Sequence, residues 1–183
     1  VGEVQQDILR DGGYLPGFAN TDADDLARTA RFTASSCKAG INPQDVVNGV
    51  SRKIGADFNG WQSDGFAPGG ETLTMTFDGE KQVSELRFVF HSDFKYPIRV
   101  TMCPNRQVQQ RPGVPAELMQ DYDVELLRGG KVVKTIPVRG NHQRLNVLKF
   151  DATACDQVNL RCLSTNGAPD ATVFEVRAYS EQK

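Results

Sequence analysis

Apolar and polar residues alternate in short runs along the chain from Arg31 onward, and this alternation limits the fold more than any other feature. Residues 72–77 show it most clearly, since Leu73, Met75 and Phe77 occupy every second position and threonines stand between them. Successive side chains of a β-strand point to opposite faces, so this spacing is typical of a strand with one buried face. The chain is therefore expected to consist mainly of β-strands.

Comparable runs follow one another, separated by segments rich in Gly, Pro, Asn and Asp. Short strands at this spacing favour a sandwich or jelly roll over a parallel α/β sheet, in which helical patterns would alternate with the strands. We predict an all-β, jelly-roll β-sandwich of about eight strands. Besides 72–77, the expected strands are 31–36, 85–90, 98–102, 122–126, 131–138, 145–150, 157–163 and 172–179.

Residues 1–30 follow a different pattern and are predicted to be a short helical segment, the tail of a preceding module. Val1, Val4 and Ile8 recur at helical spacing, and a pair of glycines then supplies a stop. This segment has too few apolar residues to offset the entropy of folding alone. The predicted organisation is a helical linker over 1–30 and a β-sandwich domain over 31–183.

Charge and composition exclude several classes of partner. The net charge is −2 and the isoelectric point is about 5.7, so no basic surface for nucleic acid is expected. No apolar run approaches the roughly 20 residues that span a bilayer, so membrane insertion is not expected. The cysteines contain no CxxC pair, which argues against a zinc or redox motif, and they leave disulfide pairing or four buried thiols open. They are Cys37, Cys103, Cys155 and Cys162.

Several short motifs, in order, resemble a known family. The runs TASS, PQDVVNGV, GWQSDG and SELRFVF, with VFEVRAY near the end, are similar to the discoidin-like, coagulation-factor C-type domain, a galactose-binding-like β-sandwich. The resemblance covers about residues 31–180. It implies a galactose-binding-like fold without catalytic machinery of its own. In agreement, no nucleophile-elbow GxSxG motif is present, and the pair Asp121 and Asp123 is typical of a solvated strand end.

A second resemblance concerns the context of the domain. VQQDILRDGGYLPG and DADDLARTARFTASS, with NHQRLNVLKF and LSTNGAPDATVFEVRAY, are similar to the C-terminal region of bacterial FAD-dependent oxidoreductases. This implies that the chain is a non-catalytic C-terminal accessory domain, serving interdomain packing or substrate-cleft shaping. FAD would belong to the missing flavoprotein module, because no GxGxxG fingerprint occurs here. Bacterial discoidin-like domains are often exported, which favours a periplasmic or extracellular location.

The discoidin-like resemblance also implies a structural calcium. Its matching positions are Asn48, in the loop after the first strand, and Glu175, in the last strand. Calcium takes six to eight oxygen ligands, which such a loop and a distant carboxylate can supply. Asn48 stands where the family usually has Asp, which removes a charge. The alternative is that Asn48 makes a turn with Gly49 and that Glu175 pairs with an arginine.

The second functional hypothesis is a carbohydrate-binding module that recognises sugar through loops at one end of the sandwich. Trp61 could stack on a sugar ring, or instead close the core. Polar residues of two loops suit hydroxyl groups, but they could equally dock on the preceding flavoprotein module. The candidate ligand-binding residues are Trp61, His91, Asn141, His142 and Arg144.

Overall fold

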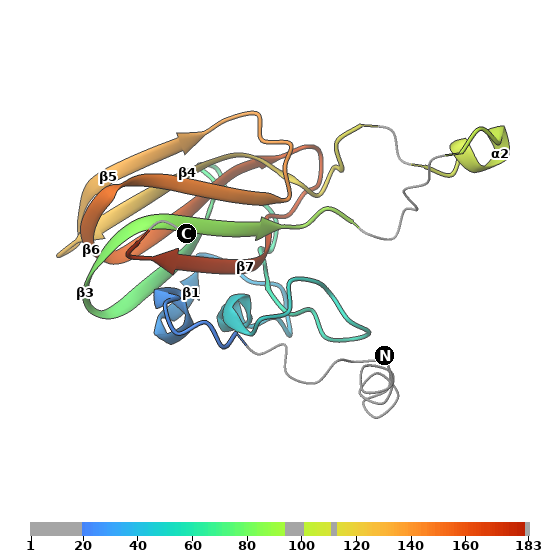
Figure 1. The fold of residues 1–183 in the computed structure, drawn as a ribbon. Helices are drawn as coiled ribbons and strands as arrows, with labels where there is room; N and C mark the ends of the chain where they lie inside the picture. The colour runs from blue at the N-terminus through green and yellow to red at the C-terminus, as the bar shows by residue number, and fades with distance from the viewer. Residues whose placement is uncertain (1–19, 94–100, 111–112, 182–183) are drawn as a thin grey trace, which may run out of the picture.

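Seven strands and three short helical turns make up the described part of the protein. The computed structural model describes residues 20–93, 101–110 and 113–181 (Figure 1). The expected helix near the N-terminus, within residues 1–19, lies outside them. The helical turns are η1 (Leu26–Thr29), η2 (Pro43–Val47) and α2 (Pro104–Gln107). The strands are β1 (Arg31–Ala34), β2 (Trp61–Gln62), β3 (Glu71–Phe90), β4 (Met119–Arg128), β5 (Lys131–Val138), β6 (Leu145–Thr165) and β7 (Thr172–Tyr179).

Two layers share the long strands β3 and β6, which run antiparallel beside each other over their whole length. The first half of β3 and the second half of β6 join β1, β4 and β5 in one layer. The second half of β3 and the first half of β6 join β7 and β2 in the other (Figure 1). The register slips between Thr76 and Lys81, where the exposed segment 78–80 lets β3 pass from one layer to the other.

Aromatic side chains from the two layers meet in the core. The ring centroids of Phe90 and Tyr122 lie 5.2 Å apart, and those of Phe88 and Tyr122 lie 6.2 Å apart with an edge-on geometry. Phe88 and Phe90 come from β3, whereas Tyr122 comes from β4 in the other layer. Burial raises the pKa of the Tyr122 hydroxyl, which donates a hydrogen bond to the Asn146 side chain over 2.7 Å. The sandwich predicted from the alternation is confirmed.

Strand number and boundaries differ from the prediction in places. The runs 72–77 and 85–90 form one strand, β3, and the runs 145–150 and 157–163 form β6. The predicted strand 98–102 lies partly outside the described residues, and its last member, Met102, is 92% exposed and not in a strand. That end of the prediction is wrong, because alternation alone does not show whether an apolar side has a partner surface.

The segment just before β1 packs against β7. Asp25 Oδ1 accepts hydrogen bonds from the backbone N–H groups of Ala27 and Ala178, each over 3.0 Å. Asp22 accepts a hydrogen bond from the Tyr179 hydroxyl over 3.0 Å. The Asp25 carboxylate thus satisfies a backbone N–H of β7 beyond the short pairing of this strand with β2. Residues 20–30 therefore contribute to the same core as the sandwich.

All four cysteines are free thiols. Cys155 and Cys162 are buried, Cys37 is half-buried and Cys103 is exposed. Burial, together with the charges of Asp156 and Glu80, raises the pKa of the Cys155 thiol to about 11. Of the two interpretations left open by the sequence, the structure shows the thiol form, with two of the four outside the core.

Candidate functional site

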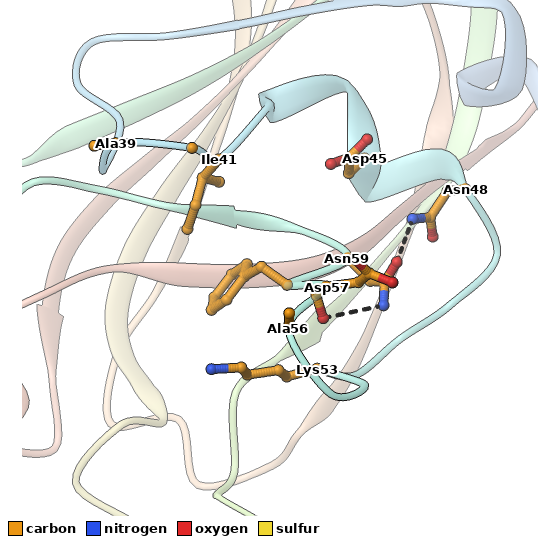
Figure 2. A pocket seen from close by; sticks show the side chains of 10 residues that line it. Ala39, Ile41, Asp45, Asn48, Lys53, Ala56, Asp57 and Asn59 are labelled. Atoms are coloured by element: carbon orange, nitrogen blue, oxygen red, sulfur yellow. Dashed lines mark hydrogen bonds between the residues drawn. The ribbon is translucent and has the colours of Figure 1, made fainter. Parts of the chain in front are cut away.

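A pocket of about 540 Å³ opens between η2 and the loop 53–59, at one end of the sandwich (Figure 2). Its size suits a small polar molecule. Asp45 lies on the η2 side, and Lys53 lies on the opposite side. The pocket is lined by Ala39, Gly40, Ile41, Asp45, Asn48, Lys53, Ala56, Asp57, Phe58 and Asn59.

Hydrogen bonds within the segment 48–59 hold together one side of the pocket. The amide of Asn48 donates to Asn59 Oδ1 over 3.0 Å, and the amide of Asn59 donates to the carbonyls of Arg52 and Asp57 (Figure 2). Asn59 has a φ of +57°, a left-handed conformation that Asn tolerates better than most residues. The backbones of Ile54 and Asp57 also form an isolated β-bridge. The hydrogen bonds of this segment therefore set the shape of the pocket.

One wall of the pocket is aromatic. The ring of Phe58 stacks on Phe174 of β7 with centroids 5.4 Å apart, and Phe174 is itself buried. His91 meets the same Phe174 ring edge-on at 5.3 Å. His91 therefore lies behind the wall and is not among the lining residues. The apolar surface available to a ligand comes from Phe58 and Ile41.

Three charged side chains line the pocket without engaging one another. Among the described residues, no hydrogen bond or ion pair holds the side chains of Asp45, Lys53 or Asp57. Asp45 is half-buried, and this burial raises the pKa of its carboxyl group. Charged groups that lose water without gaining a protein partner are costly unless something else binds them. This cost applies to the half-buried Asp45, which therefore has most to gain from a ligand, whereas Lys53 and Asp57 are exposed and remain available to bind one.

Trp61 belongs to the core, and the stacking role considered for it is wrong for this structure. Its side chain is 0% exposed, and its indole N–H donates to the carbonyl of Ser36 over 2.9 Å. Trp61 pairs with Val173 at the start of β7, where the large ring fills the end of the sandwich. The neighbouring aromatic residues Phe58 and Phe66 are half-buried, so they form no exposed patch with it.

The loop 139–144 does not line the pocket, but it contacts Ser51, just before the loop 53–59. Asn141 is buried, and its amide donates to the carbonyls of Met119 and Gln143, so it holds its own loop in place. His142 is exposed. The guanidinium of Arg144 donates to the carbonyl of Ser51. The structure thus brings Arg144 to Ser51, close to the loop 53–59 that lines the pocket. The amide of Asn141, in contrast, is already bound to backbone carbonyls.

Asn48 and Glu175 do not offer the donor set of a calcium site. The side-chain oxygen of Asn48 accepts the Val50 N–H over 2.8 Å, and its amide donates to Asn59. The carboxylate of Glu175 accepts from Arg177 Nε over 2.5 Å. Asn48 carries no charge, and both side chains already have protein partners. The residues present therefore do not fit a divalent cation that needs several oxygens of its own.

Comparisons with known proteins bear on the fold. The sequence matches no protein-family model and no curated protein. A fucose binding module of Streptococcus pneumoniae superposes with a TM-score of 0.64 at 13% identity, covering 88% of this chain and 99% of that one. The lectin domain of lectinolysin, complexed with Lewis B antigen, gives 0.65 at 15% identity, covering 88% and 100%. The fold is galactose-binding-like.

A third solved structure supports the same conclusion. A family 32 CBM from C. perfringens NanJ, in complex with galactose, superposes on the galactose-binding-like sandwich with a TM-score of 0.59 at 11% identity. The superposition covers 85% of this chain and 98% of that one. At such identities the likeness defines the fold only. The discoidin-like resemblance read from the motifs is confirmed at this level.

Other predictions stay predictions. Neither the galactose-binding-like fold nor the comparisons bear on the flavoprotein module, on FAD or on an accessory role beside them. No helix among the described residues is both long and apolar enough to cross a membrane.

Sequence reasoning missed the three charged residues of the pocket lining, Asp45, Lys53 and Asp57. Each is a charged residue in a loop or at a helical turn, and such residues are usually solvated. The one available signal is the group of Asn and Gly residues around them, because these residues favour turns with a left-handed backbone conformation.

Proposed function

We propose that this chain is a carbohydrate-binding module and that the pocket between η2 and the loop 53–59 holds a sugar unit. The observation that carries the proposal is the pocket itself, which combines an aromatic wall with three charged side chains that no described residue binds. Sugars present both surfaces that such a pocket matches, since their C–H faces pack on apolar side chains and their hydroxyls need hydrogen bonds. The sugar complexes among the structural neighbours support this choice of ligand.

Each lining group has a distinct role in the proposed recognition. The carboxylates of Asp45 and Asp57 accept hydrogen bonds from sugar hydroxyls, and the ammonium group of Lys53 donates to a ring or hydroxyl oxygen. Phe58 and Ile41 lie against the C–H face of the ring. The backing by Phe174 keeps the Phe58 ring in one orientation, so little conformational freedom is lost on binding.

Isothermal titration calorimetry against a panel of mono- and oligosaccharides tests the proposal. We expect one class of sugar to bind, and Asp57→Ala or Lys53→Ala to weaken it about tenfold or more, as the loss of a charged hydrogen bond predicts. Lys131→Ala, at the exposed β4–β5 turn, is the matched control and should bind normally.

Two results would contradict the pocket assignment. If no sugar of the panel binds, the carbohydrate proposal itself fails. If a sugar binds but His142→Ala abolishes binding and Asp57→Ala does not, the site lies at the loop 139–144 instead.

A further inference from the structure

The loop 48–53, which forms one side of the pocket, needs a tie to the rest of the sandwich. Among the described residues it has no strand partner, and the hydrogen bonds of the Asn48 side chain and the Arg52 carbonyl reach only Val50 and Asn59, within the same segment 48–59. The contact that crosses from this loop to a strand-bearing segment is the hydrogen bond from the Arg144 guanidinium to the carbonyl of Ser51. Ser51 directly follows Val50, whose N–H is bound by the Asn48 side chain, so this contact positions the turn that Asn48 makes.

Arg144 reaches the loop from a rigid base. Its carbonyl accepts the N–H of Phe90 at the end of β3 over 2.9 Å. The preceding residue, Gln143, donates its N–H to the side chain of Asn141 and its carbonyl accepts from Asn146. Arg144 is half-buried, so its guanidinium does not move freely in water. An arginine anchored at its backbone and buried along its stem acts as a fixed donor.

The charge of Glu175 lies close enough to act on this guanidinium. Burial lowers the pKa of Arg144, and the negative charge of Glu175 opposes that shift, while the positive charge of Arg52 adds to it. Glu175 is 9% exposed and also pairs with Arg177. The carboxylate of Glu175 thus pairs with Arg177 and also acts on the charge of Arg144. A divalent cation placed beside Glu175 would meet net repulsion from these arginines.

We propose that the Arg144 guanidinium takes the place of a calcium ion here, holding the loop 48–53 through the carbonyl oxygen of Ser51 without metal. A guanidinium offers five N–H donors in a fixed plane and stays charged at any physiological pH. It can therefore bind carbonyl and carboxylate oxygens together, as a cation would. The neutral Asn48, bound to Val50 and Asn59, is consistent with a loop that no longer requires a metal ligand. This inference does not depend on the proposed sugar.

The experiment combines calcium titration with substitution. Wild-type protein is titrated with calcium chloride by calorimetry and melted in calcium chloride and in EDTA. We expect no binding heat and melting temperatures that agree within about 1 °C. Arg144→Met should lower the melting temperature by about 5 °C, as the loss of a buried charge partner predicts for a domain of this size. Arg144→Lys, which keeps the charge without the planar fork, should recover part of that loss.

A local measurement separates this role from general loss of packing. In hydrogen exchange, Arg144→Met should raise exchange in residues 50–57 and leave β4 and β5 unchanged. Arg128→Met, which removes an exposed ion pair with Glu80, is the control and should change neither observable. Saturable calcium binding to wild-type protein would overturn the proposal, even if Arg144→Met failed to fold. A variant Arg144→Met that melts and exchanges like wild type would overturn it as well.

Discussion

At the scale of single residues, Glu71 shows how a buried carboxylate is held at the start of β3. Its side chain accepts the hydroxyls of Ser35 and Ser36 over 2.5 and 2.6 Å, and the N–H of Ala67 over 3.0 Å. Burial alone would raise the pKa of Glu71, but these hydrogen bonds together lower it below the ordinary value of 4.5. The ionised form is therefore the one that the fold stabilises.

Stability should depend on pH through this residue. Because the folded pKa is depressed, Glu71 contributes fully above its unfolded pKa, and the contribution is lost as pH falls below about 4.5 through the lower folded value. Glu71→Gln should cost about 1–3 kcal/mol at neutral pH, and the difference from wild type should shrink in acid. Urea unfolding at several pH values measures both quantities. A difference that stays constant down to acid pH would contradict this account.

Trp61 gives a second test at the same scale. Trp61→Phe removes the hydrogen bond to the Ser36 carbonyl and leaves a small cavity, so it should cost about 1–3 kcal/mol of unfolding free energy. Because the ring is buried, any sugar affinity should stay within about twofold of wild type. Chemical unfolding and sugar titration on the same preparation check both parts. A large loss of affinity without a loss of stability would return Trp61 to the binding site.

At the scale of elements, the loop 53–59 that lines the pocket returns to the sandwich at Gly60, just before β2. A Cβ at this position would lie 2.6 Å from the carbonyl oxygen of Val173, in the backbone of β7. Gly60→Ala should therefore push the loop away from β7 and lower stability by about 1–3 kcal/mol. Gly79→Ala is the matched control, because nothing lies within 4 Å of its Cβ. Equal melting temperatures for the two variants would contradict this prediction, because the loop would then move away from β7 without any loss of stability.

Elements also show what a sequence can and cannot predict. The alternation over 72–77 located β3 correctly, because one buried face imposes a period of two. The same pattern could not show that β3 continues to Phe90, since a bulge at 78–80 resembles a turn in composition. The pocket was harder still. Asp45 comes from η2 and Asp57 from the loop 53–59, and only the fold places them around one cavity.

At the scale of the whole molecule, charge should select among sugars. The pocket carries two carboxylates against one ammonium group, and the chain has a net charge of −2. Both the local and the overall field therefore favour a sugar with an amine over one with a carboxylate. We expect glucosamine units to bind several-fold more tightly than glucuronic acid units, with the ratio falling as salt increases. Competition titrations at low and high salt measure this. A preference for the acidic sugar would contradict the assigned charges.

The sharing of β3 and β6 between the two layers has a consequence for how the protein is made. Neither layer is complete without both strands, and Glu71 in β3 pairs with Cys162 near the end of β6. A chain emerging from the ribosome therefore holds its apolar strand faces unpaired until β6 has been synthesised. Folding should then occur in one late step, and truncation anywhere within β6 should leave an aggregation-prone product rather than a smaller domain.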